Sequence, residues 1–200
     1  MKRILVGLAA TALAASTTFA ADVWQIDPAH SSATFAITHL LISTVRGEFG
    51  KMSGTIEYDG SSVPSIKVEA TIDAATISTR NEYRDKDLKS DHFFDVAKYP
   101  TLTFKSKKAV AGTGGGFQLV GDLTMHGVTK EVTLDATGPS KIIKGGKGES
   151  RVAASATTKI NRQDFGIAGG AGTAGDTVAI TIDIEAMLTP VIAPTAPAGK

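Results

Sequence analysis

Apolar and polar residues alternate with a period of two along most of the chain. The clearest example lies near the C-terminus, where Val178, Ile180, Ile182 and Ile184 occupy every second position. Successive side chains of a β-strand point to opposite faces, so this pattern predicts a strand with one buried and one solvated face. Similar runs predict about eight strands, at residues 31–38, 52–59, 65–73, 101–109, 117–125, 132–136, 151–159 and 178–188.

Glycine-rich turn signals separate the predicted strands. They include Asp59-Gly60, the run at residues 112–116, Gly145-Gly146 and a loop at residues 166–175. Because most connections are short, consecutive strands are expected to pair as antiparallel neighbours. Two packed sheets and a closed barrel both satisfy this pattern. We favour an all-β, antiparallel eight-stranded barrel, because closure leaves no free strand edges.

A short helix is predicted within this β protein, after the third or fourth strand. Thr79 followed by Glu82 matches a capping box, which predicts a helix start at that point. Tyr83 and Leu88 supply a narrow apolar stripe, and Pro100 favours an extended chain before the next strand. We expect this helix to close one end of the barrel.

Residues 1–20 have the features of a secretory signal peptide. A basic start at Lys2-Arg3 precedes an apolar run at residues 4–15 that is short for a membrane span. Small residues in the pattern Thr-Phe-Ala end at Ala20, where we predict cleavage and export of a soluble protein. The alternative is an uncleaved N-terminal anchor.

Composition limits the classes of partner. Without residues 1–20 the chain keeps 19 of its 21 basic side chains and all 20 acidic ones, a net charge of about −1. This balance argues against nucleic acid or an anionic membrane surface as the main partner. Cysteine is absent, which excludes thiol chemistry. We predict one domain at residues 21–189, a flexible tail rich in Pro and Ala at 190–200, and no stable membrane insertion.

The volume of the inward side chains decides whether an eight-stranded barrel is filled or hollow. Positions expected to point inward include Ala70, Gly121, Ala136, Ala154 and Ala156, and only 6% of all residues are aromatic. An underfilled interior favours an elongated apolar ligand, since empty voids cost stability. A barrel packed with its own side chains is the alternative. The predicted apolar lining comprises Phe35, Ile37, Phe104, Leu119, Leu123, Leu134, Ile180, Ile182 and Ile184.

Five motifs, spread from Val23 to Leu188, resemble those of the YceI-like family of periplasmic, polyisoprenoid-binding proteins. They are Asp27-Pro28-Ala29-His30-Ser31 with Phe35 and His39, Gly47-Glu48-Phe49 with Gly54, and the segments 77–104, 121–130 and 160–166. The resemblance implies a lipocalin-like barrel that holds a long isoprenoid or similar amphiphilic lipid in the periplasm. It leaves open carriage, storage or stress-related sequestration of that lipid, and whether two chains form a homodimer.

Polar side chains gather around the predicted helix and suit the head of an amphiphile. Guanidinium and imidazole groups hydrogen-bond to phosphate or hydroxyl oxygens. The head-group candidates are His39, Arg80, Asn81, Arg84 and His92. The alternative is a solvated helix in which Arg84 forms an ion pair with Asp85 or Asp87. The polar segment 161–164 is interpreted as a structural bridge between a loop and the barrel rim.

The residues favour binding over catalysis. The four histidines, His30, His39, His92 and His126, lack the spacing of metal-binding helices and fingers, so we expect no metal and no cofactor. His30 and Ser31 are neighbours that face opposite ways on a strand, and no Gly-x-Ser-x-Gly elbow occurs. We therefore predict a protein that is not an enzyme. Two alternatives are a lipid-modifying enzyme that uses a histidine, and a structural or partner-binding module with a packed core.

Overall fold

A computed structural model describes residues 21–188 of the chain. Its strands are β1 (Asp22–Ile26), β2 (Ser32–His39), β3 (Ser43–Phe49), β4 (Met52–Tyr58), β5 (Lys67–Asp73), β6 (Ile77–Ser78), β7 (Thr101–Ala111), β8 (Gly116–Met125), β9 (Val128–Thr137), β10 (Ile143–Lys144), β11 (Ser150–Asn161) and β12 (Ala174–Leu188). One helix, α1, covers Glu82–Lys89, and four short 3₁₀ turns are η1 (Val63–Ser65), η2 (Ala74–Thr76), η3 (Thr113–Gly115) and η4 (Arg162–Phe165). The predicted signal peptide and C-terminal tail lie outside the described residues.

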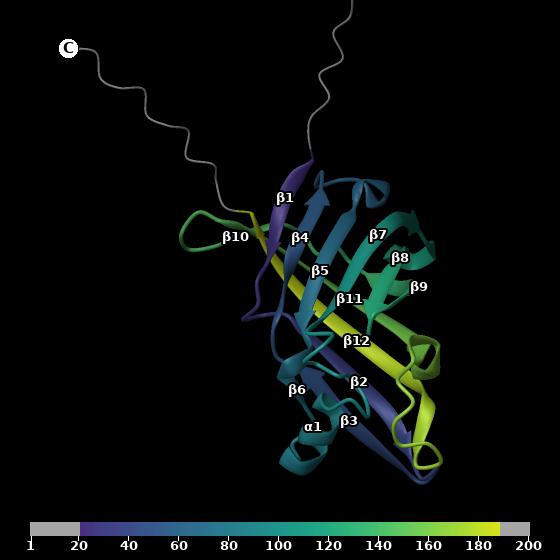
Figure 1. Cartoon of the computed structure of the whole chain (residues 1–200). Coiled ribbons are helices and arrows are strands. Elements are labelled where there is room, and N and C mark those ends of the chain that lie inside the picture. The colour runs from purple at the N-terminus through teal and green to yellow at the C-terminus, as the bar shows by residue number, and fades with distance from the viewer. Residues whose placement is uncertain (1–20, 189–200) are drawn as a thin grey trace, which may run out of the picture.

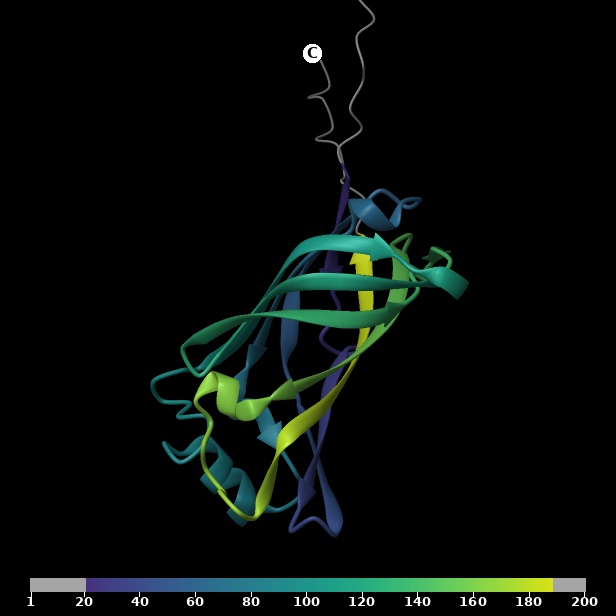
Figure 2. The same ribbon diagram turned by 90° about the vertical axis from the view of Figure 1, so that its right-hand side faces the viewer.

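Eight strands close into an antiparallel barrel, which confirms the predicted architecture (Figures 1 and 2). Around the ring the order is β11, β9, β8, β7, β5, β4, β1 and β12, and β12 pairs back onto β11. That closing pair is long, from Ser150 opposite Leu188 to Asn161 opposite Thr177. β12 bonds β1 near its C-terminal end and β2 along the rest of the same edge, so β2, β3 and β6 extend the wall beyond the ring.

The structure contains four strands that the alternation pattern did not predict, namely β1, β3, β6 and β10. β6 and β10 have two residues each, too few to show a period. In β3 the alternation is weak because an inward position holds Gly47, where a Cβ would lie 2.4 Å from the Phe35 ring. As a result α1 follows β6, and its predicted position after the third or fourth strand is wrong.

Helix α1 begins two residues later than the capping-box pattern predicts. The side-chain oxygen of Asn81 accepts a hydrogen bond from the backbone N–H of Arg84 at 3.0 Å, so Asn81 is the N-cap. The hydroxyl of Thr79 instead donates to the carboxylate of Asp85. The expected apolar stripe is also incomplete, because Tyr83 is 88% exposed.

Two groups of buried side chains lie at opposite ends of the barrel. The first, which includes Trp24 of β1, Phe117 and Ala186, lies at the end of the barrel where β1 begins. The second includes Phe49, Ile77 and Phe165, and Leu88, Phe93 and Phe94 from α1 and the segment after it pack against it. This packing places α1 across the second end, as expected from the sequence. We call it the helix end: α1, the turn between β2 and β3, and η4 with the loop that follows it (Figure 2).

The bend between β1 and β2 is held by Asp27, which is only 6% exposed. Its carboxylate accepts hydrogen bonds from the backbone N–H of Ala29 at 2.9 Å and pairs with His30 Nδ1 at 2.8 Å. Arg151 of β11 lies 3.3 Å from the same carboxylate and also bonds Glu185 of β12. The bend is thereby tied to the strands that close the barrel.

Acidification is expected to weaken the hydrogen bonds of Asp27 and so to lower the stability of the fold. The hydrogen bond from His30, followed by that from Ala29, lowers the pKa of Asp27 below its ordinary 3.8. A carboxyl with a lowered pKa in the folded state contributes stability above the pKa of the unfolded state and loses it as the pH falls through the folded value. In urea unfolding, Asp27→Asn should be less stable than the unmodified protein at pH 7, and the difference should begin to shrink near about pH 4 and disappear as the pH falls further through the lowered pKa of Asp27. A constant difference across this range would contradict the assignment; the exposed Asp91→Asn serves as control.

Candidate ligand cavity

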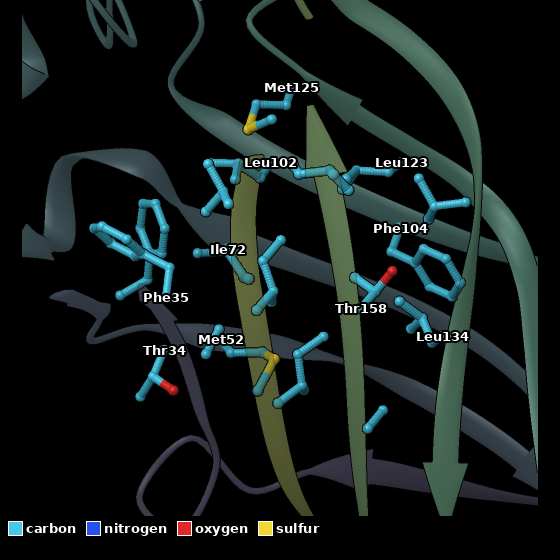
Figure 3. A pocket seen from close by; sticks show the side chains of 18 of the residues that line it. Thr34, Phe35, Met52, Ile72, Leu102, Phe104, Leu123, Met125, Leu134 and Thr158 are labelled. Atoms are coloured by element: carbon cyan, nitrogen blue, oxygen red, sulfur yellow. The ribbon is translucent and has the colours of Figure 1, made fainter. Parts of the chain in front are cut away.

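The barrel encloses a cavity of about 450 Å³ that runs between the two buried groups. In Figure 3 its labelled lining side chains come from β2, β4, β5, β7, β8, β9 and β11 and converge on one space. A volume of this size is typical of sites for small organic ligands. The interior is therefore hollow, which contradicts the alternative of a fully packed core.

All nine side chains predicted as apolar lining border this cavity, from Phe35 on β2 to Ile184 on β12. Alternation places them correctly because one face of each strand is inward over its whole length. Whether they touch a ligand stays a prediction. Further apolar lining residues, absent from the predicted set, include Phe49, Met52, Ile56, Tyr58, Ile72, Phe93, Phe94, Leu102 and Met125. Met52, Ile56 and Tyr58 alternate on β4, so the same signal was available for them.

Small side chains create the hollow. Ala70, Ala136, Ala154 and Ala156 all border the cavity, where larger aliphatic residues would fill it. Gly121 has a different role, because a Cβ there would lie 2.6 Å from the Phe104 ring and 2.5 Å from the Lys105 carbonyl oxygen. The absence of a Cβ at Gly121 thus makes room for the ring of Phe104, which borders the cavity.

Charged lining residues are confined to the helix end. They are Arg84 and Asp87 of α1 and Arg162 of η4. Two of the predicted histidines, His39 and His92, lie beside them on the lining and are exposed, so the cavity reaches solvent at this end. The cavity therefore has an apolar length and one polar end, as an amphiphile requires.

Two of the five head-group candidates do not face the cavity. Asn81 is absent from the lining because its side chain caps α1. Arg80 is exposed and absent as well, since its backbone turns into the left-handed region, with φ 59°, just before the cap. Adjacent positions in sequence thus point away from one another at the start of a helix. The structure brings together His39, Arg84 and His92, but not Arg80 or Asn81.

Arg84 is held by Thr79, not by a carboxylate. Its Nε donates to the hydroxyl of Thr79 at 2.7 Å and its Nη2 to the carbonyl oxygen of Thr79 at 3.0 Å. The ion pairs of Arg84 with Asp85 or Asp87, the alternative for this helix, do not occur among the described residues. Asp85 accepts from the N–H of Thr79 at 2.8 Å, and Asp87 pairs with His92 Nδ1 at 3.2 Å. Nη1 of Arg84 has no hydrogen-bond partner within residues 21–188, so it is available to a ligand.

Arg162 is buried, with 4% of its surface exposed, and its guanidinium organises the loop after η4. Nη1 donates to the carbonyl oxygens of Ile167 at 2.7 Å and Gly169 at 2.6 Å. Nε donates to the carbonyl oxygen of Gly175 at 2.9 Å and Nη2 to that of Ala174 at 3.2 Å. The segment 161–164 thus bridges the barrel rim and the loop after η4, as predicted, and it fixes that loop at the helix end.

Within residues 21–188, one cluster outside the cavity brings together side chains that could bind a metal ion. Oxygen and nitrogen atoms of Asp27, His30 and Glu185 lie within 4.8 Å of one another. The guanidinium of Arg151 bonds both carboxylates, so a positive charge already occupies the place of a cation. His126 is not on the cavity lining: its Nδ1 is 3.2 Å from the carbonyl oxygen of Phe165 and its ring packs edge-on against Tyr99.

The model of the YceI-like domain matches residues 24–186 of the chain. Protein YceI of Escherichia coli is 37% identical over 192 residues, which cover 92% of this chain and 97% of that protein. The crystal structure of the Campylobacter jejuni YCEI protein has 34% identity and a TM-score of 0.67, over 76% of this chain and 90% of that one. A polyisoprenoid binding domain from Saccharophagus degradans shares the fold at 18% identity, with a TM-score of 0.62 over 84% and 99% of the two chains. This chain belongs to the YceI-like family.

Proposed function

We propose that this protein binds a long isoprenoid or similar amphiphilic lipid inside the barrel and carries it in the periplasm. The observation that supports this most directly is the cavity, mainly apolar along its length and charged only at the helix end. An aliphatic tail would lie along the apolar part, with its polar head near Arg84, His39 and His92. A structural relative is a polyisoprenoid binding domain, which supports the same ligand class here.

The hydrophobic effect is large enough for such binding. Burying roughly 500 Å² of hydrocarbon contributes on the order of 12 kcal/mol at about 25 cal/mol per Å². Association and ordering oppose it by about 4–15 kcal/mol. Micromolar or tighter affinity is therefore feasible for a long chain, whereas a short chain would bury too little surface.

The periplasmic location rests on the signal-peptide features of residues 1–20 and on the family resemblance. No helix within residues 21–188 is long and apolar enough to cross a membrane. We propose binding without catalysis, because His39 and His92 are exposed at the rim and His126 holds the backbone at Phe165. A lipid-modifying enzyme is the alternative, and loss of turnover on substitution of His39 or His92 would favour it.

The test is to identify what the barrel contains. The protein is released from the periplasm of its own host, purified without detergent, extracted with chloroform and methanol, and the extract is measured by mass spectrometry. We expect a long-chain lipid in near-stoichiometric amount, and none from Ile182→Asp purified in parallel. Recovery of no lipid from well-folded protein, together with no uptake of a long polyprenol in vitro, would contradict the proposal.

Replacement of Arg84 by alanine is expected to weaken binding of a phosphorylated amphiphile about tenfold or more. A hydrogen bond to a charged group contributes about 1.5–3 kcal/mol, and about 1.4 kcal/mol corresponds to a factor of ten. Affinities for a polyprenyl phosphate and for the matching unsubstituted hydrocarbon are measured by fluorescence competition. Lys86→Ala removes the same charge from an exposed position of α1 and should change neither affinity. Equal loss for both ligands would show that Arg84 acts only through Thr79 and the local fold.

A further inference from the structure

The turn between β2 and β3 carries an exposed apolar tip, formed by Leu40, Leu41 and Ile42. Their exposed fractions are 50%, 90% and 84%. With Tyr83 of α1, Leu41 and Ile42 are the most exposed large apolar side chains within residues 21–188. Single exposed aliphatic residues are common on protein surfaces, but three in succession at the end of a projecting turn indicate a contact surface.

The backbone of this apolar tip does not suit leucine. Leu40 and Leu41 have φ of 51° and 61°, in the left-handed region that glycine and asparagine occupy at lower cost. The turn is held there by hydrogen bonds from Leu40 N–H to the Thr173 carbonyl at 2.7 Å and from Ile42 N–H to the His39 carbonyl at 3.1 Å. The conformation of the turn therefore does not explain why its residues are apolar. We infer that these side chains contact an external partner.

The turn that carries the apolar tip and the loop hydrogen-bonded to it contain no fully charged side chain. Residues 38–45 and 166–175 include no Asp, Glu, Lys or Arg. The bond between Leu40 and Thr173 joins these two segments, and Figures 1 and 2 both show them at the helix end, away from the chain termini. Moving charges out of water is costly, so a surface without them can enter an apolar phase with little opposition.

The apolar tip also lies beside the opening of the cavity. His39 precedes it on β2 and Val45 follows it on β3, and both border the cavity. Thr173, the hydrogen-bond partner of Leu40, borders the cavity too. A partner or membrane that binds the apolar tip therefore lies close to the cavity opening.

We propose that the apolar tip inserts into the interface of a lipid bilayer and holds the helix end of the barrel against the membrane. Leu41 and Ile42 would enter the boundary between head groups and acyl chains, and Tyr83 would lie at head-group level, a position that suits its amphipathic ring. Attachment of this kind is peripheral and reversible. Passage of a ligand between bilayer and cavity at this point rests on the proposed function, whereas docking of the tip does not.

A second copy of the chain is a less suitable occupant. Three aliphatic side chains bury on the order of 300 Å² of apolar surface. A stable protein interface needs about 800 Å² from each partner, with shape complementarity that a projecting turn does not provide. A bilayer accepts a small projecting tip without a matching surface, and the absence of charges predicts no preference for anionic lipids.

The first experiment measures flotation with phosphatidylcholine vesicles. The protein is purified in the form that the cell releases, and its intact mass is recorded because the apolar run at residues 4–15 could itself bind lipid. The test variant is Leu41→Asn/Ile42→Ser, in which asparagine suits the left-handed backbone and so preserves the fold. The matched control is Ile142→Ser/Ile143→Ser, which removes two exposed aliphatic side chains, 42% and 59% exposed, at the start of β10. In Figure 1 β10 lies at the opposite end of the barrel.

We expect the test variant to bind vesicles at least about tenfold more weakly than the unmodified protein, and the control to bind equally well. Binding should change little between low and high salt, because no charge at the tip is screened. Equal binding of both double variants, or no binding by the unmodified protein, would overturn the proposal. So would a dimer in light scattering that dissociates only in the test variant.

A second measurement detects insertion directly. Trp24, the one native tryptophan, is 1% exposed and supplies a constant background. Ile42→Trp should shift its emission to shorter wavelength when vesicles are added, whereas Ile143→Trp should not. No shift at position 42 would refute insertion even if lipid is found inside the barrel. Conversely, insertion by protein that yields no lipid on extraction would leave docking intact and contradict only the carrier function.

Discussion

Replacing Arg162 by methionine is expected to lower the free energy of unfolding by about 3–5 kcal/mol. The guanidinium donates to four backbone carbonyl oxygens, those of Ile167, Gly169, Ala174 and Gly175. Methionine has a comparable length and fills the space, but it leaves these acceptors without donors. Each buried acceptor without a partner costs about 1–3 kcal/mol, although solvent will reach those nearest the loop surface.

Urea unfolding followed by tryptophan fluorescence measures this loss, and hydrogen exchange locates it. The amides of residues 166–175 should lose protection first, because Arg162 connects both sides of that loop. Arg162→Lys keeps the charge but lacks the planar fork, so it should restore only part of the stability. Lys159→Met, on the exposed face of β11, is the surface control and should change stability by less than about 0.5 kcal/mol. A loss of less than about 1 kcal/mol for Arg162→Met would show that water replaces the guanidinium.

Replacing Ile182 by aspartate is expected to cost about 3 kcal/mol of stability and to abolish lipid binding. Ile182 borders the cavity and packs against the buried group that contains Trp24. A carboxylate there has no basic side chain beside it in the apolar part of the lining, since Arg84 and Arg162 belong to the helix end. The aspartate must either stay ionised in an apolar space or take up a proton, and both outcomes oppose folding at pH 7.

The matched control is Thr181→Asp, one residue earlier on β12 and on the exposed outer face. It introduces the same charge into the same strand and should alter stability by less than about 1 kcal/mol, with lipid binding retained. The two variants are compared by thermal unfolding and by uptake of a fluorescent polyprenol. If Ile182→Asp were as stable as Thr181→Asp, the inward and outward faces of β12 would have to be exchanged.

Period-two alternation was enough to predict an all-β protein and nine of the apolar side chains that line its cavity. In β12, Val178, Ile180, Ile182 and Ile184 form one face, and that face borders the cavity throughout. Inward and outward orientation is a local property, because each residue of a strand reverses the direction of the one before. The hollow could also be anticipated, since Ala136 and Ala156 have side chains too small to fill a barrel of eight strands.

Strands that are short or contain glycine escaped prediction for a related reason. β6 has two residues, and β3 presents Gly47 inward beneath the Phe35 ring, so neither contains a readable apolar period. The helix start was predicted two residues too early. Thr79, with Glu82 three residues later, and Asn81 both have side chains that can cap a helix. The end of β6 at Ser78 positions Thr79 and Asn81, so that the side chain of Asn81 and not that of Thr79 caps the helix.

The polar end of the cavity required the tertiary structure. Arg80, Asn81 and Arg84 are close in sequence, yet only Arg84 borders the cavity, because Thr79 binds its guanidinium while Asn81 is used as the cap. Side-chain direction in such a segment depends on hydrogen-bond partners that come from the whole fold.

The strands and the apolar face of each one could be predicted from the amino-acid sequence alone, because both follow from patterns between near neighbours along the chain. Three features appeared only in the three-dimensional fold. β12 closes the ring, Arg162 donates to carbonyl oxygens of the loop after η4, and Leu41 and Ile42 project beside the cavity opening. These features join segments far apart in sequence, so their geometry depends on the packing of the complete barrel.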